Sequence, residues 1–178
     1  MFFPKKQNPP AGLPDANESS AGFVFIRKAL LVVEGSQPSV QATTFAIKLA
    51  RQTGCELLAV SVVDTATLDY LLQLHIFVQD EREELEQDLV HKGRRYLAGV
   101  EEEAKAAGIS VRTHLCSGRF HQMILHLAND YQPDVIIIGG WKHEIKQKDT
   151  TSVERQLIMD LAECPVIVVK SKTEPKHC

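Results

Sequence analysis

Short apolar runs alternate with helical stripes along most of the chain. Apolar runs occupy 29–33, 57–63 (interrupted only by Ser61), 135–138 and 166–169, and a shorter candidate strand lies at 110–115. Apolar runs without polar alternation are typical of strands that are covered on both faces of a parallel sheet. The pattern therefore predicts five strands.

Between these runs, apolar residues recur at the three- and four-residue spacing of an amphipathic helix. Such stripes lie at 42–50, 80–107, 120–131 and from about 152 onward, whereas 65–79 is ambiguous and could form a short helix over a cleft. At about 1.5 Å per residue, the second stripe would span roughly 40 Å and reach past the sheet. On the last helix we expect these side chains to face inward: Val153, Leu157, Ile158 and Leu161.

The elements alternate strictly between strand and helix. Parallel strands need crossover connections, and those helices pack on both faces of an open sheet. We therefore predict an α/β fold: a doubly wound, Rossmann-like open parallel sheet of five strands. One domain at 23–170 would follow a proline-rich arm at 1–22, expected to be disordered, and precede a polar tail at 171–178.

Composition narrows the classes of partner. The 178 residues are 44% hydrophobic and 24% charged, with a net charge of −3, and carry no basic stripe, which argues against a nucleic-acid partner. No apolar run approaches the ~18–20 residues that span a bilayer, so we expect no membrane insertion. The four cysteines are scattered without a C-x-x-C pair, as in the reducing cytosol, so we expect a cytoplasmic protein.

Negative charge is concentrated in one predicted helix. Between Asp80 and Gly108 there are nine acids and five bases, so this segment alone carries a charge of −4. A solvated helix face is the preferred interpretation, and a docking surface for a partner is the alternative.

Motifs for catalysis and metal binding are missing from the sequence. His121 and His126 are five residues apart on a helix, so they cannot bind one metal together, and we expect them at the surface, with His114 at a strand edge. There is no H-E-x-x-H, G-x-S-x-G or G-x-x-x-x-G-K-[ST] motif. We therefore predict no catalytic residue and no metal site.

Four segments together resemble one known family. They are KALLVVEGSQPS at 28–39, CELLAVSVVD at 55–64, DVIIIGG at 134–140, and 152–169, which ends in ECPVIVV. Their order and spacing are similar to the universal stress protein family over about 26–170. The resemblance implies stress-linked regulation through protein contacts by a homodimer, formed where the last strands pair antiparallel through Val166, Ile167, Val168 and Val169.

Members of this family that bind ATP carry a glycine motif after the fourth strand. In this motif two residues separate the first glycine from the second, nine residues separate the second from the third, and Ser or Thr follows the third. Glycines let the backbone approach phosphates, and the next helix offers free N–H groups to them. Here Gly139 fits the first position, but Lys142 stands at the second, and Thr151-Ser152 keeps the final hydroxyl without its glycine. Glu34 replaces the usual Asp after the first strand. We therefore expect no ATP binding of the usual kind and no cofactor.

The main prediction is thus a regulatory protein whose ATP motif is degenerate, and two alternatives to it stay open. One is a switch that binds ATP or AMP through a modified phosphate loop, and the other is a slow ATPase in which Glu34 or Asp64 positions water. Docking on a regulatory protein or a transporter also remains open. If a nucleotide binds, the resemblance places it against Val33, Glu34, Val62, Gly139, Gly140, Trp141, Lys142, Thr151, Ser152 and Val153.

Overall fold

The computed structural model describes residues 25–76, 78–140 and 150–170, without the side chains of Thr150 and Thr151. The strands of this part are β1 (Lys28–Val32), β2 (Glu56–Asp64), β3 (Val111–Gly118), β4 (Val135–Gly139) and β5 (Val166–Val169). Its helices are α1 (Gln37–Thr53), α2 (Thr65–Gln73), α3 (Gln79–Ala106), α4 (Phe120–Tyr131) and α5 (Thr150–Leu161).

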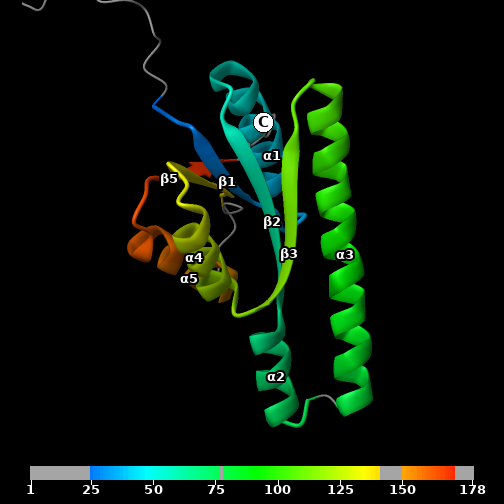
Figure 1. Cartoon of the computed structure of the whole chain (residues 1–178). Coiled ribbons are helices and arrows are strands. Elements are labelled where there is room, and N and C mark those ends of the chain that lie inside the picture. Colours follow the sequence, from blue (N-terminus) through cyan, green and yellow to red (C-terminus); the bar gives the residue numbers. More distant parts are fainter. Residues whose placement is uncertain (1–24, 77, 141–149, 171–178) are drawn as a thin grey trace, which may run out of the picture.

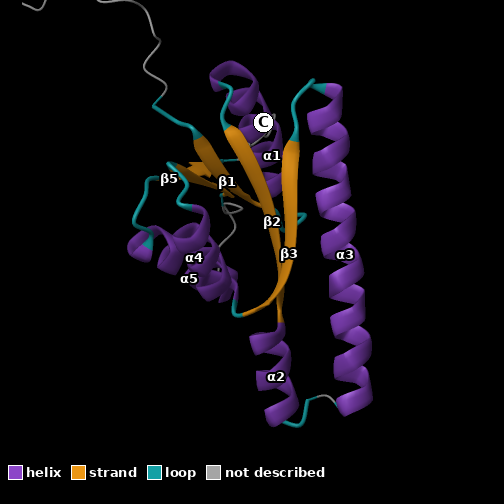
Figure 2. Ribbon diagram, in the orientation of Figure 1, coloured by secondary structure: helices purple, strands orange, loops and turns teal. Residues whose placement is uncertain are grey.

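The strands form one parallel sheet in the order β3-β2-β1-β4-β5, with helices on both faces (Figures 1 and 2). The predicted doubly wound fold is confirmed. The chain runs outward from β1 to β3 and then returns to β4 on the other side of β1. The order therefore reverses between β1 and β4, which is where open sheets of this kind bind ligands.

Each face of the sheet has its own hydrophobic core. Ala29 and Leu31 of β1 point to the face covered by α1 and α3, whereas Leu30 and Val32 point to the face covered by α4 and α5. All four are 0–2% exposed. Because both sides of these strands are buried, they need the continuous apolar runs that the sequence shows.

A very close contact joins β4 to the start of α1. Ser36 caps α1 by accepting a hydrogen bond from Ser39 N at 3.3 Å, and the turn so formed lies against Gly139 at the end of β4. A Cβ at position 139 would lie 2.6 Å from the backbone nitrogen of Ser39. Close packing against α1 therefore explains why residue 139 is a glycine, without any ligand.

The ambiguous segment at 65–79 forms α2 and the turn after it. Only Leu68 of α2 is buried, and α3 has no buried residue before Gly93. The first 14 residues of α3, about 21 Å at the usual helical rise, therefore project with α2 beyond the sheet, as the lower part of Figure 1 shows. The predicted overhang of this helix is confirmed.

The inward face predicted for α5 is partly wrong. Val153 and Leu161 are 47% and 57% exposed, whereas Glu154, Arg155 and Ile158 are buried. The helix is rotated by about one position from the purely apolar stripe because both charged side chains find partners on neighbouring elements.

Among the described helices, none is long and apolar enough to cross a membrane.

We predict that Gly139→Ala destabilises the fold by about 2–3 kcal/mol, because the added methyl group meets backbone atoms that cannot move aside independently. Urea unfolding of both proteins measures the change. Gly99→Ala is the matched control: it lies in α3 with open space around it, so it should stabilise the protein by up to about 1 kcal/mol. Equal effects of the two substitutions would contradict the packing role of Gly139.

Candidate functional site

A cavity of about 380 Å³ opens at the carboxyl ends of β1 and β2. This volume is at the lower end of the ~300–1,000 Å³ that small-molecule sites occupy. The helices α2 and α3 close one side of the cavity, and Phe120 at the start of α4 and Glu154 of α5 supply the rest. Its lining residues are Glu34, Ser61, Val62, Val63, Asp64, Thr67, Leu68, Leu89, Lys92, Gly93, Tyr96, Phe120 and Glu154.

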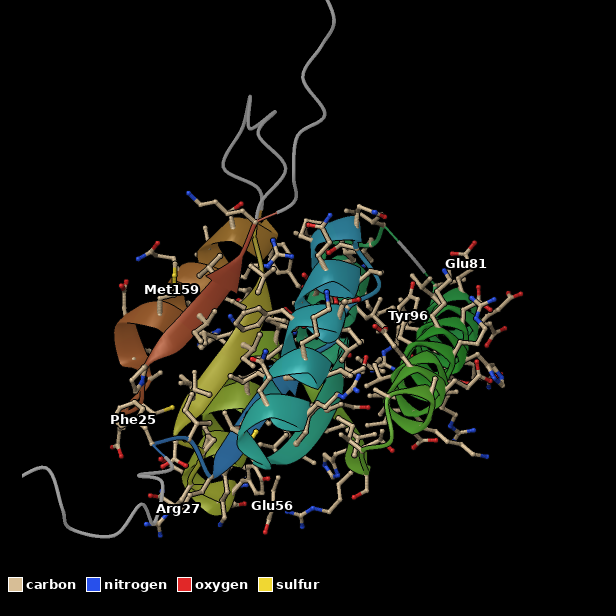
Figure 3. The ribbon with its side chains drawn as sticks, turned by 90° about the horizontal axis from the view of Figure 1, so that it is seen from above. Phe25, Arg27, Glu56, Glu81, Tyr96 and Met159 are labelled. Atoms are coloured by element: carbon tan, nitrogen blue, oxygen red, sulfur yellow. The ribbon has the colours of Figure 1, made fainter. Side chains whose placement is uncertain are left out.

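The turn after β1 is built around Gly35. Its φ of 73° is left-handed, and a Cβ there would lie 2.1 Å from the Tyr96 ring, so any other residue would be strained and would displace the ring. Tyr96 comes from α3 and points toward the rest of the domain (Figure 3). The ring thus covers the turn that carries Glu34 and forms part of the cavity wall.

The carboxylate of Glu34 is held by α5. The guanidinium of Arg155 donates a hydrogen bond to Oε1 of Glu34, and Ser36 Oγ donates to the same oxygen at 3.3 Å. The side chain of Arg155 is 8% exposed and that of Glu34 is 19% exposed. This largely buried ion pair ties the second turn of α5 to the end of β1.

The neighbouring Glu154 holds the start of α4 in the same way. Its Oε2 accepts hydrogen bonds from the backbone N–H of His121 at 2.9 Å and pairs with Nδ1 of that ring at 2.6 Å. A carboxylate is stabilised at a helix N-terminus, where the first N–H groups are free. The expectation that His121 is a surface histidine is therefore wrong, since its side chain is only 12% exposed, whereas His126 is 66% exposed as expected.

Carboxylates dominate the polar lining of the cavity. Glu34, Asp64 and Glu154 reach it, while Lys92 is the one cationic side chain among its lining residues. An adjoining hollow of about 310 Å³ shares Asp64 and Glu154 and adds Arg119. The lining of the cavity therefore carries more acidic than basic side chains.

Nothing in the described residues equips the cavity for nucleophilic or metal chemistry. No group of three or more His, Cys, Asp or Glu side chains there is placed to hold a metal ion. Cys116 lies near the end of β3, where burial raises the pKa of its thiol and keeps it protonated. Asp64 caps α2 by accepting hydrogen bonds from Thr67 N at 3.2 Å and Thr67 Oγ1 at 2.7 Å.

Only some residues of the predicted nucleotide site come together. Glu34 and Val62 line the cavity, whereas Val33 is buried in the core beneath α1 and α3. Gly139 and Gly140 are buried at the end of β4, and neither lines this cavity. Ser152, which is half-buried, and Val153, which is exposed, lie on α5 and do not line the cavity. Trp141 and Lys142 fall outside the described residues, and the side chain of Thr151 is not described.

Sequence reasoning missed Glu154, Arg155 and their partner His121. A signal was present, because Glu154 is four residues before the fully buried Ile158 and so shares its helix face. The wall formed by Lys92 and Tyr96 was missed as well. These residues belong to α3, and the sequence does not show which part of so long a helix passes over the strand ends.

A sequence model of the Universal stress protein family matches residues 26–170, which is most of the chain. The chain belongs to the universal stress protein family. A curated relative from Methanocaldococcus jannaschii, Universal stress protein MJ0531, is 26% identical over 151 residues, covering 81% of this chain and 82% of the relative. This membership confirms the resemblance drawn from the strand and turn segments.

Solved structures of universal stress proteins share the fold. The protein UspA from Lactobacillus plantarum matches with a TM-score of 0.66 at 19% identity, over 81% of this chain and 97% of that one. An Arabidopsis thaliana family member, solved with AMP bound, matches with a TM-score of 0.58 at 17% identity, over 82% of this chain and 92% of its own.

We predict that Arg155→Met lowers the free energy of unfolding by about 3 kcal/mol, because it leaves the Glu34 carboxylate largely buried without its partner. Adding Glu34→Gln should restore part of this loss, and urea unfolding of the single and double variants measures the coupling. Arg112→Met is the control. It breaks the exposed pair with Glu56 (3.2 Å) and should cost less than about 1 kcal/mol. Equal losses from Arg155→Met and Arg112→Met would refute the structural role of the buried pair.

Proposed function

We propose that this chain is a stress-response regulatory protein that acts through protein contacts, without catalysis and without the family's usual ATP. Membership of the universal stress protein family supports the stress-response setting. The observation that carries the rest is the charge of the cavity, whose lining has three carboxylates, those of Glu34, Asp64 and Glu154, and one cationic side chain, Lys92.

The neighbouring charges argue against a triphosphate in two ways. Like charges repel strongly in a partly buried site, so three carboxylates oppose a ligand with several negative charges. Two groups that could attract phosphate are also already paired, since Arg155 binds Glu34 and the backbone N–H of His121 at the start of α4 donates to Glu154. A protein with such a site is better suited to present a surface to other proteins.

An adenine-nucleotide switch is the second candidate. The apolar and aromatic lining, with Val62, Tyr96 and Phe120, suits a base ring, and the Arabidopsis relative was solved with AMP bound. A monophosphate would bring less negative charge than ATP. The slow ATPase has less support, because Glu34 and Asp64, the two carboxylates available to position water, are committed to Arg155 and to the cap of α2.

The proposal includes a homodimer formed through β5. This strand is at the edge of the sheet and is apolar throughout, and unpaired apolar edges tend to associate with another strand. On α5, the partly exposed Val153, Leu157 and Leu161 recur every four residues and so share one helix face. Pairing of two β5 edges would bring further apolar surface of this kind into a dimer.

We expect calorimetric titration of the purified protein to rank affinities as adenosine, then AMP, then ATP, with ATP not binding below millimolar concentrations. The carboxylates of the cavity penalise each added phosphate, so this order is the reverse of that for a phosphate-binding cradle. Mass spectrometry of small molecules released on denaturation should find no stoichiometric adenine nucleotide. A bound nucleotide, or ATP binding more tightly than adenosine, would reject the main proposal and favour the switch.

We also expect the protein to sediment at twice the mass of one chain and Val168→Pro to sediment as a monomer. The carbonyls of Pro165 and Val169 accept hydrogen bonds from β4, so by the alternation of the ladder the N–H of Val168 points to the open edge. Proline removes that N–H and is tolerated on edge strands. Circular dichroism checks that the variant is folded. A folded variant that remains dimeric would place the interface elsewhere.

A further inference from the structure

The helical hairpin made of α2 and the first half of α3 projects away from the domain. We name this segment, residues 65–76 and 78–92, the projecting hairpin (Figure 1). Its two helices are tied together by Arg82, which donates to Asp69 at 2.8 Å and also pairs with Glu86. The hairpin is therefore an ordered part of the fold that the sheet does not need for its own core.

Apolar side chains are exposed at the end of this hairpin. Tyr70, Leu74, Ile76 and Val78 are 50–62% exposed, and all four lie within nine positions of the chain. Tyr70 and Leu74 are four residues apart on α2 and share one helix face. Scattered exposed apolar residues are normal, but a local group of them on a projecting element is a candidate interaction site.

The surroundings of this apolar group are acidic. Over the projecting hairpin the sequence has seven acidic residues and two basic residues, Lys92 and Arg82, for a charge of −5. That arginine already pairs with two of the acids. Glu81 lies on the side of α3 away from the sheet (Figure 3). The hairpin thus combines exposed apolar groups with strong, unbalanced negative charge.

The helix itself does not account for these acids. Acidic residues in the first turn stabilise a helix N-terminus, which explains Asp80 and Glu81, and Glu81 also accepts a hydrogen bond from Val78 N at 3.1 Å. The effect fades beyond the first turn. Asp80, Glu84 and Asp88 are four residues apart, so like charges face each other along the helix and destabilise it. A cationic partner would relieve this repulsion.

We propose that the projecting hairpin docks a basic amphipathic helix of another protein. Leucine-type side chains of the partner would cover Tyr70 and Leu74, while its lysines and arginines would face the acids of α3, a recurring mode of helix recognition. A second copy of this chain is disfavoured because its hairpin carries the same charge. Nucleic acids and anionic membranes are disfavoured by the same repulsion. The proposal deepens the proposed action through protein contacts and rests on it.

The test uses the full chain and a designed, fluorescein-labelled peptide of about 18 residues. The peptide has leucine at helical spacing i, i+3, i+4 and i+7 and lysine elsewhere, and its counterpart has glutamate in place of lysine. Fluorescence anisotropy should show binding of the lysine peptide, weakening as salt rises, and none of the glutamate peptide. Absence of lysine-peptide binding at low salt would overturn the proposal.

Two double variants locate the binding. Tyr70→Ser with Leu74→Ser, and Glu84→Lys with Asp88→Lys, should each weaken lysine-peptide binding at least tenfold, and the charge reversal should gain binding of the glutamate peptide. All four side chains are exposed, and circular dichroism checks the fold. The matched controls lie outside the hairpin: Phe25→Ser with Val40→Ser, and Glu102→Lys with Glu163→Lys, and these should stay within about twofold of the unaltered chain.

Each contrary result has its own meaning. If the control variants lose binding as much as the hairpin variants, the peptide recognises overall charge and the proposal fails. If the hairpin variants alter the sedimenting mass, the hairpin contacts a second copy and the proposed partner is wrong. The nucleotide titration does not depend on these substitutions, so failure of the docking proposal remains distinguishable from failure of the proposed function.

Discussion

Two adjacent charged side chains on α5 hold the carboxyl end of the sheet together. Arg155 binds Glu34 after β1, and Glu154 binds the first turn of α4 through His121. A buried charge without a partner is costly, so each of these side chains fixes the position of the element that it contacts. The same contacts limit what the cavity offers to an anionic ligand, since they pair Arg155 and the backbone N–H of His121 with carboxylates.

The long α3 has two different roles along its length. Its second half packs on β2 and β3 through Gly93, Leu97, Val100 and Ala104, and Gly93 lets the helix approach closely because a Cβ there would meet Leu115 at 2.7 Å. Its first half has no sheet to cover and carries few apolar residues. The change in sequence character along the helix therefore matches the change in what lies beneath it.

Much of the architecture follows from the sequence because it depends on periodicity. Strands buried on both faces need continuous apolar runs, and β1 and β4 show them, while the partly buried edge strand β5 is apolar as well. The segment that became α2 was harder to predict, since only Leu68 of its leucines is buried and tertiary contacts decide the rest. The face of α5 was mispredicted because the buried Glu154 and Arg155 depend on partners 33 and 121 residues away in sequence, which a pattern of polarity does not reveal.

The base of the projecting hairpin is also a wall of the cavity, since Thr67 and Leu68 of α2 and Leu89 and Lys92 of α3 line it. The hairpin would therefore connect the cavity to the proposed docking site by a single pair of helices. Thermodynamic linkage makes the relation reciprocal: a ligand that changes the spacing of α2 and α3 changes partner affinity by some factor, and the partner changes ligand affinity by that same factor. Even weak binding of a ligand in the cavity would then change how much of the protein has a partner bound at the hairpin.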